Sequence, residues 1–247
     1  MILYLVRHAQ SRNNALWLAT SSHKNRVPDP LLSDTGRQQA RHLAEFVKSG
    51  RESESELWSP SDGRQGFGIT HLYSSLMLRA VETGLMVSKT IGVPLNGWID
   101  IHETGGIVSG DGEEIPFEGQ PGSTESYLRR EYPDLMFTGQ FGEQGWWNRP
   151  REDEAEKRPR AHRVVQTLLE KHGHSEDRVL MITHGSFYIH LMREMMGIHD
   201  TNVYFELSNT GITRWEVYPN RRDSSQWVRM LVYMNRTDHL PPELVTI

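Results

Sequence analysis

The first residues of the chain form an unbroken apolar run. Five apolar residues, Ile2 to Val6, are followed at once by Arg7 and His8. A run without polar alternation is typical of a strand that is buried on both faces, as in a parallel sheet covered by helices. Such sheets bind their ligands at the carboxyl ends of the strands. We therefore expect Arg7 and His8 to lie at the mouth of a pocket.

Two later apolar runs predict further strands of the same sheet. Residues 69–73 are followed by a short polar turn and Arg79, and residues 179–183 end at His184. A third segment, 93–99, is also extended in character. Because parallel strands end at one edge of a sheet, Arg79 and His184 are expected to lie beside the residues that follow the first strand.

Helical periodicity alternates with these strands. In four segments, apolar residues recur at the spacing of one helix face, with serines suited to capping the start or glycines suited to ending the helix. The predicted helices run from Ser33 to Gly50, from Ser74-Ser75 to Ile91, from Arg160 to Gly173 and from Phe187 to Gly197. Alternating strands and helices predict a three-layer α/β/α sandwich with a mostly parallel sheet and the first strand at its centre.

Three other regions complete the expected architecture. Residues 51–67 are rich in Glu, Ser and Gly and predict a surface loop. Residues 102–158 are irregular and rich in Gly and Pro, which is typical of a functional insertion. We expect a single domain over 1–247 with a cap inserted at 104–158. The tail holds three strand-like pieces that predict antiparallel additions at the sheet edge, namely 203–207, 212–218 and 227–234.

Composition narrows the range of functions. The chain has 247 residues, with 27 Lys and Arg against 32 Asp and Glu, and the formal net charge of −5 does not favour nucleic-acid binding. The absence of cysteine excludes thiolate catalysis, disulfides and cysteine-based zinc sites. No secretory leader or membrane-length apolar run is recognisable, so we expect a cytoplasmic protein without membrane partners.

The residues at the strand ends are suited to binding and attacking a phosphoryl group. Two arginines, Arg7 and Arg79, present planar sets of donors that match phosphate oxygens. The amino termini of the following helices would add backbone N–H groups. A neutral imidazole is a competent nucleophile toward phosphorus, and neighbouring arginines would lower the pKa of His8 and keep it neutral. The pattern therefore predicts a dianion pocket that contains a nucleophile.

A leaving alkoxide needs a proton donor, for which Glu103 is the best candidate. It follows the extended segment 93–99 and precedes Gly105-Gly106, where the cap begins. Three nearby carboxylates remain alternatives, namely Asp100, Glu113 and Glu114.

Four stretches, taken together, resemble the histidine phosphatase superfamily, also called phosphoglycerate mutase-like. Residues 7–14, RHAQSRNN, resemble its RHG-type signature. Residues 29–40, residues 73–83 and Thr183-His184-Gly185 resemble its later blocks in the same order. The resemblance covers roughly residues 1–105 and 160–215, and each block lies at a predicted strand end or helix start.

The resemblance implies a phosphomonoester hydrolase of the histidine acid type, with the phosphoglycerate mutase-like fold. His8 would be the phosphorylated residue, and the phosphoryl group would be bound by Arg7, Arg79 and His184. Glu103 would be the proton donor. Neither a metal nor an organic cofactor is implied. Three further residues of the matching blocks are implied to contact substrate, namely Ser11, Asn14 and Gly185.

Two departures from the family pattern bear on the reaction. Ala9-Gln10 stands where Gly-Glu is usual, which the turn should tolerate. Thr104 to Ile107 replaces the Arg-His-Tyr-Gly run with which mutases contact phosphoglycerate. This favours a phosphatase, and the large, acid-containing cap with two tryptophans suits a small organic phosphate more than a phosphoprotein. Two alternatives remain open: a phosphoglycerate mutase, and a catalytically silent phosphate-binding protein.

Specificity is expected to lie in the cap. Trp146, Trp147 and Arg149 would either grip substrate or attach the cap to the core. His172 and His174 form an HxH pair without an evident third ligand, so metal binding there is not expected. The expected partner is a small phosphorylated substrate, and an edge strand would also allow a homodimer.

Overall fold

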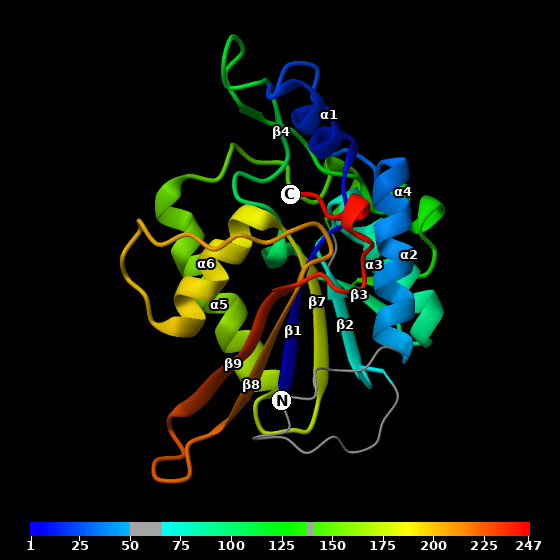
Figure 1. Cartoon of the computed structure of the whole chain (residues 1–247). Helices are drawn as coiled ribbons and strands as arrows, with labels where there is room; N and C mark the ends of the chain where they lie inside the picture. Colours follow the sequence, from blue (N-terminus) through cyan, green and yellow to red (C-terminus); the bar gives the residue numbers. More distant parts are fainter. Residues whose placement is uncertain (50–65, 138–140) are drawn as a thin grey trace.

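A seven-stranded, mostly parallel sheet forms the centre of the computed structural model, which describes residues 1–49, 66–137 and 141–247 (Figure 1). Its strand order is β6-β3-β2-β7-β1-β8-β9. We expected the first strand at the centre of the sheet. β1 is an interior strand between β7 and β8, but the central strand is β7. The strands are β1 (Ile2–Arg7), β2 (His71–Ser74), β3 (Leu95–Gly97), β6 (Leu135–Phe137), β7 (Arg178–Thr183), β8 (Ile212–Pro219) and β9 (Trp227–Arg236).

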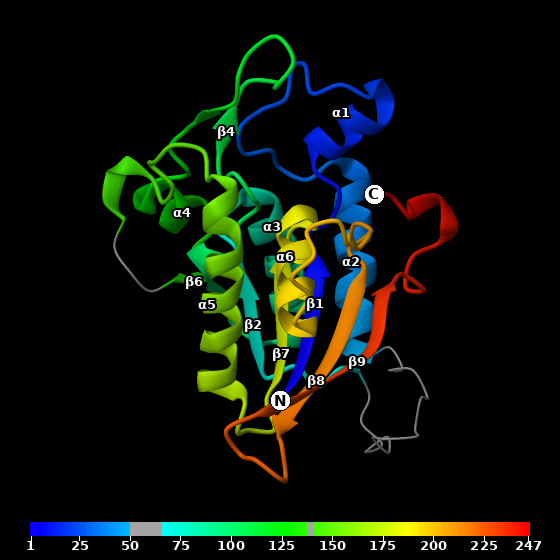
Figure 2. The same ribbon diagram turned by 90° about the vertical axis from the view of Figure 1, so that its left-hand side faces the viewer.

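Helices cover both faces of this sheet and produce the predicted three layers (Figures 1 and 2). α2 and α3 pack on one face, and α5 and α6 pack on the other. α1 and the small β4-β5 hairpin lie beyond the carboxyl ends of the strands (Figure 2). The helices are α1 (Arg12–Thr20), α2 (Asp34–Ser49), α3 (Leu78–Ile91), α4 (Glu125–Glu131), α5 (Glu154–His172) and α6 (Gly185–Met196), and the hairpin strands are β4 (Val108–Ser109) and β5 (Glu118–Gly119).

The apolar run of β1 is buried because its side chains enter two cores. Tyr4 and Val6 join the core under α2 and α3. Leu3 and Leu5 join the core under α5 and α6. Successive strand residues point to opposite faces, so a strand covered on both sides needs apolar residues at every position.

Several predicted helix ends are confirmed. The Ser33 hydroxyl accepts a hydrogen bond from the Gly36 amide at 2.9 Å and caps α2. Gly173 and Gly197 follow the last residues of α5 and α6. Gly50 and most of the predicted loop 51–67 lie outside the described residues.

Two predicted helix starts are wrong. α3 begins at Leu78 after Met77, and its first amide is bonded by the distant Asp29 carboxylate at 3.0 Å instead of by Ser74 or Ser75. α5 begins at Glu154, six residues before Arg160, because Asp153 and Glu156 form a reciprocal capping box. Local apolar spacing did not reveal either cap.

Predictions for the less regular regions are mixed. The antiparallel strands β8 and β9 lie at the sheet edge as expected. Residues 203–207 form no strand, and the Arg193 side chain instead bonds the Val203 carbonyl at 2.9 Å. The range assigned to the cap contains Leu135–Phe137, which forms the other edge strand of the main sheet. None of the described helices combines the length and apolar character that a bilayer crossing requires.

Candidate active site

The carboxyl ends of β1, β2 and β7 lie together, as the sequence predicts. Arg7 is in register with Thr183, and Ser74 is in register with Ile182. A cavity of about 470 Å³ opens at this edge. Its wall includes six of the predicted site residues, namely Arg7, His8, Ser11, Asn14, Arg79 and Glu103.

His8 is 3% exposed, and both of its ring nitrogens have defined partners. Nδ1 lies 2.7 Å from the Ala9 carbonyl, which can only accept, so this nitrogen carries the proton. Nε2 accepts a hydrogen bond from the Arg79 Nε at 3.0 Å. Burial, reinforced by the charges of Arg79 and Arg7, holds the pKa of His8 well below its usual value near 6.5. The ring is therefore neutral at physiological pH, with its lone pair on Nε2.

The backbone that carries His8 is held from three directions. The side-chain amide of Asn209 donates to the His8 carbonyl at 3.0 Å, and the backbone amide of Ala9 donates to the Thr83 hydroxyl at 3.1 Å. The Gln10 amide donates to the Gln39 side chain at 2.7 Å. Ala9 is not among the residues with a positive φ, so this turn does not require the glycine that is usual in the family.

Two arginines lie beside His8. Arg7 donates from Nη1 to the Leu207 carbonyl at 2.7 Å, while its buried Nε has no hydrogen-bond partner among the described residues. Burial lowers the pKa of Arg7 to about 10, which leaves it charged at neutral pH. Arg79 Nη1 lies 3.8 Å from Asp29 Oδ1. Burial raises the pKa of Asp29 to about 6, with Arg79 opposing the shift.

His184 lies behind the cavity and packs against His8. The centroids of the two rings are 5.0 Å apart. His184 Nε2 lies 2.6 Å from the Ser75 hydroxyl, and Nδ1 is buried without a partner among the described residues. Neither His184 nor Gly185 lines the cavity in the described part of the chain. Gly185 instead lies against Arg7, since a Cβ atom there would be 3.4 Å from Arg7 Nε.

Glu103 is fixed at the amino terminus of α6. Its carboxylate accepts hydrogen bonds from the amides of Thr104 at 2.7 Å, Ser186 at 3.1 Å and Phe187 at 2.9 Å. The helix terminus expected to bind phosphate thus binds this carboxylate. Of the four candidate acids, Glu103 is the one that lines the cavity, and Glu114 pairs with Lys24 at 2.6 Å.

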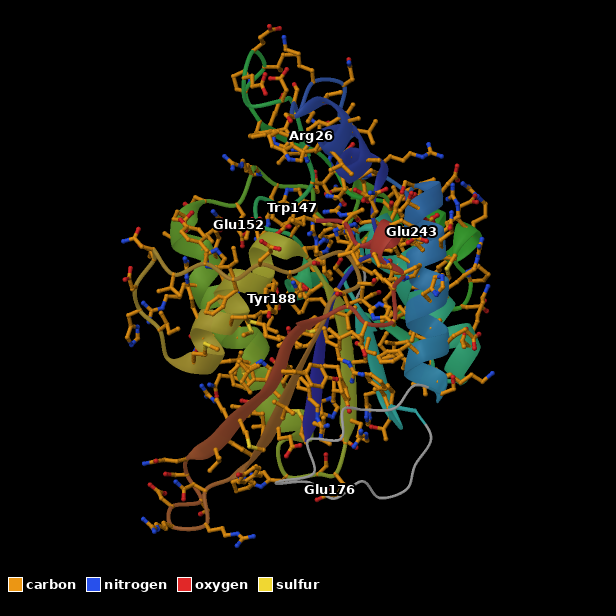
Figure 3. The ribbon with its side chains drawn as sticks, in the orientation of Figure 1. Arg26, Trp147, Glu152, Glu176, Tyr188 and Glu243 are labelled. Carbon is orange, nitrogen blue, oxygen red and sulfur yellow. The ribbon has the colours of Figure 1, made fainter. Side chains whose placement is uncertain are left out.

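A buried ion pair, which no sequence pattern indicated, holds the segment before Glu103. Arg160 bonds both carboxylate oxygens of Glu152, at 2.6 and 2.7 Å. It also donates to the carbonyls of Asp100 and His102 at 2.8 and 2.9 Å. The pair joins α5 to the loop that carries Glu103, with Glu152 labelled in Figure 3.

Ser11 and Asn14 line the cavity and also cap α1. The Asn14 side-chain oxygen accepts from the Ser11 amide at 3.0 Å, and the Ser11 hydroxyl accepts from the Asn14 amide at 3.1 Å. This reciprocal pair starts α1 directly after the His8 turn.

The tryptophans of the proposed cap lie behind the cavity wall. Trp147 is 4% exposed and packs edge-on against His102, with ring centroids 4.7 Å apart. The Arg149 guanidinium covers the Trp147 ring at 4.1 Å. Neither Trp147 nor Arg149 is among the described residues that line the cavity.

The remaining cavity wall comes from the short helix α1 and from irregular segments, for which the sequence offered no periodic signal. Residues of α1 and of the loop after it contribute to this wall. The β4-β5 hairpin, the loop before α5 and the end of the chain contribute the others. The contributing residues not predicted from sequence include Trp17, His23, Arg26, Phe117, Arg151 and Ile247.

The predicted HxH pair does not converge on one point. His174 packs against Trp227, whereas His172 faces His71 and Asp177 at the amino-terminal end of the strands. In the described chain, His71, His172 and Asp177 are the group whose potential ligand atoms come within 4.8 Å of one another. Hydrogen bonds to Asp177 and to the Tyr73 hydroxyl engage both nitrogens of His172.

Comparison with known families decides where the chain belongs. Residues 3–229 match the model of the histidine phosphatase superfamily, branch 1. The chain belongs to this superfamily. This match confirms the predicted superfamily. A search of the curated proteins found no significant match.

Several solved structures share the fold of this chain. A mycobacterial glucosyl-3-phosphoglycerate phosphatase aligns over 96% of this chain and 99% of its own, with 15% identity and a TM-score of 0.61. Phosphoserine phosphatase from Entamoeba histolytica, in complex with 3-phosphoglyceric acid, aligns over 97% and 99%, with 18% identity and a TM-score of 0.58. YhfR of Bacillus stearothermophilus aligns over 96% and 98%, with 18% identity and a TM-score of 0.54.

Proposed function

We propose that this histidine phosphatase hydrolyses the phosphomonoester of a small organic molecule through a covalent phosphohistidine at His8. The observation that carries the proposal is the state of this side chain. Its ring is neutral, its lone pair is on Nε2, and Arg7, Arg79 and Glu103 line the same cavity. The fold shared with phosphatases that act on small phosphates supports hydrolysis as the reaction.

In the first step, His8 Nε2 attacks phosphorus, so that a P–N bond forms while the P–O bond to the leaving group breaks. The phosphoryl oxygens take the place of Nε2 as acceptors for Arg79. Arg7 and Arg79 stabilise the charge on the equatorial oxygens, and His184 supports the His8 ring from behind. Glu103 gives its proton to the leaving oxygen.

In the second step, water attacks the phosphohistidine. Glu103, now ionised, accepts a proton from this water, and the P–N bond breaks to release inorganic phosphate. His8 and Glu103 return to their starting states, and neither a metal nor a cofactor enters the cycle.

We also propose that, of the range 104–158, the segments that line the cavity act as a cap within a single domain, whereas Leu135–Phe137 belongs to the main sheet. Thr104, Gly106, Val108, Phe117 and Arg151 all line the cavity from this range. The leaving group would therefore contact the cap, while the phosphoryl group contacts the core.

Hydrolysis of p-nitrophenyl phosphate in the presence of a chelator tests the proposed chemistry. We expect turnover in the parent and a loss of at least about 1,000-fold in His8→Ala, because the nucleophile is removed. Glu103→Gln should lose roughly 100-fold or more with an alkyl phosphate but much less with p-nitrophenyl phosphate, whose leaving group needs no proton.

A control variant at an exposed arginine outside the cavity, Arg12→Met, should retain parent activity. Undiminished turnover in His8→Ala, or no turnover in the parent with any phosphomonoester, would overturn the proposal. Rapid-quench trapping of labelled phosphate on the parent, absent from His8→Ala, would identify the covalent intermediate.

A further inference from the structure

The outer part of the cavity has a charge and shape that the phosphoryl chemistry does not use. Arg7 and Arg79 already lie beside His8. Two more arginines, Arg26 and Arg151, line the same cavity. Figure 3 shows Arg26 beside α1, beyond the strand ends and away from the core. The leaving group of a substrate would occupy this outer part.

Arg26 and Arg151 converge on one aromatic ring. The Arg26 Cζ lies 5.3 Å from the centroid of the Phe117 ring, and the Arg151 Cζ lies 5.1 Å from the same centroid. Arg26 comes from the loop after α1, Phe117 from the hairpin and Arg151 from the loop before α5. Three separate segments thus bring two like charges to one face of the cavity.

No carboxylate among the described residues forms an ion pair with Arg26 or Arg151. The Arg26 Nε is buried and has no hydrogen-bond partner in the described part of the chain. Burial and repulsion from Arg79 and Arg151 lower the pKa of Arg26, with the charge of Glu103 opposing the shift. Two neighbouring cations that share no ion pair with a described carboxylate repel each other, and a bound anion would relieve this repulsion.

The neighbouring side chains suit a small carbon skeleton. Trp17 and His23 stack with ring centroids 4.5 Å apart, and His23 meets the edge of Phe117 at 6.5 Å. These rings line the cavity together with Asn13. An organic group can therefore lie against aromatic surface while a charged end reaches the guanidinium groups.

We propose that Arg26 and Arg151 form a subsite for a second anionic group on the leaving group of the substrate, either a carboxylate or a second phosphate. The inference rests on the proposed phosphatase function and narrows its substrate class to small, doubly anionic organic phosphates. The guanidinium donors bind the second anion, and the Phe117 ring fixes their positions.

Matched substrate pairs test the subsite. 3-Phosphoglycerate and glycerol 3-phosphate differ in one carboxylate, and fructose 1,6-bisphosphate and fructose 6-phosphate differ in one phosphate. In Arg26→Met and Arg151→Met, kcat/KM for the doubly anionic member of at least one pair should fall roughly 10- to 100-fold, mainly through KM, as expected for a charge-assisted hydrogen bond. For the other member it should change less than about threefold.

The pair that responds identifies the anion as carboxylate or phosphate. Equal losses for both members of each pair, or no loss for either, would overturn the subsite. Arg12→Met is the matched control, because Arg12 is an exposed arginine of the same amino-terminal segment and lies outside the described cavity wall. Thermal unfolding of each variant separates lost binding from lost folding.

Failure of the proposed function has a different signature. If the parent hydrolyses no phosphomonoester, calorimetric binding of the same pairs to His8→Ala still tests the subsite. The doubly anionic member should then bind at least about tenfold more tightly, and Arg26→Met in that background should remove the difference. Equal affinities for both members would overturn the subsite independently of catalysis.

Discussion

At the residue scale, two hydrogen bonds define the reactivity of His8. The Ala9 carbonyl fixes the proton on Nδ1, and Arg79 donates a hydrogen bond to the lone pair on Nε2. In the proposed reaction, a phosphoryl group takes the place of Arg79 at this atom. The backbone therefore sets the tautomer of His8. Because Nδ1 carries the proton, Nε2 is the atom that would attack in the proposed reaction. A sequence shows that Arg7, His8 and Arg79 are present, but it does not show which ring nitrogen is available.

Three buried histidines should make folding sensitive to acid. Burial is the main cause that holds the pKa values of His8, His102 and His184 well below 6.5. They stay neutral in the folded chain, whereas in the unfolded chain they take up protons below about pH 6.5. The unfolded state binds more protons, so the free energy of unfolding falls as the pH falls from 6.5 toward the folded-state values.

His102→Asn isolates one of these contributions. Between pH 7.5 and 5.5, one such histidine should contribute about 1.4 kcal/mol of lost stability. Urea unfolding at the two pH values measures how much the free energy of unfolding falls. We expect this fall to be smaller by about this amount in His102→Asn than in the parent. Asp29, with its pKa of about 6, changes stability in the opposite direction in both proteins and cancels in the comparison. An unchanged pH dependence would contradict the prediction.

At the scale of elements, the start of α2 is built against the turn that carries His8. A Cβ atom at Gly36 would lie 2.0 Å from the Gln10 carbonyl oxygen, which is backbone and cannot move aside. The Ser33 amide also bonds this carbonyl at 3.0 Å. The glycine allows the helix to approach the turn that carries His8. In the sequence, nothing marked this glycine except its place in residues 29–40, which resemble the superfamily.

Gly36→Ala should therefore destabilise the protein although alanine is the better helix former. Helix propensity favours the substitution by about 1 kcal/mol. The clash should reverse the sign and lower the free energy of unfolding by about 1–3 kcal/mol, as overpacking does. Gln38→Ala, at an exposed position of the same helix, should be neutral or stabilising. Chemical denaturation of both variants checks the sign, and a more stable Gly36→Ala would contradict the structure.

At the scale of the whole molecule, the proposed phosphoryl site joins parts that are distant in sequence. Arg7 and His8 follow β1, Arg79 lies in α3, and Glu103 is fixed by α6. A bound dianion would link the sheet to the helical layer with α3. Ligands that bind only the folded state stabilise it by mass action.

Inorganic phosphate should consequently raise the thermal unfolding midpoint of the parent. At 100 times its dissociation constant, the added stability would be about 2.7 kcal/mol. Arg79→Met should show a much smaller rise, because a charged donor to the phosphate is missing, whereas Arg12→Met should resemble the parent. Scanning calorimetry in phosphate and in chloride of equal ionic strength measures the difference. Equal shifts in the parent and Arg79→Met would argue against a phosphate site at Arg79.

The sequence by itself determined the layered α/β fold, the family and the strand-end residues. Buried parallel strands need apolar residues at nearly every position, and the helices that cover them repeat apolar residues along one face, so these features are encoded within short segments. Arg7 and His8 could be placed because they follow such a strand directly. The same logic failed at residues 203–207, which form no strand and where the Arg193 side chain bonds the Val203 carbonyl.

Only the tertiary structure decided the outer cavity and the supports of the site. Arg26, Phe117 and Arg151 meet although they come from three irregular segments, and Arg160 reaches Glu152 and the loop before Glu103 inside the core. Such contacts depend on how elements pack and not on local periodicity. No repeating sequence pattern marks such contacts, so a single sequence shows which residues are present but not which of them lie together in the fold.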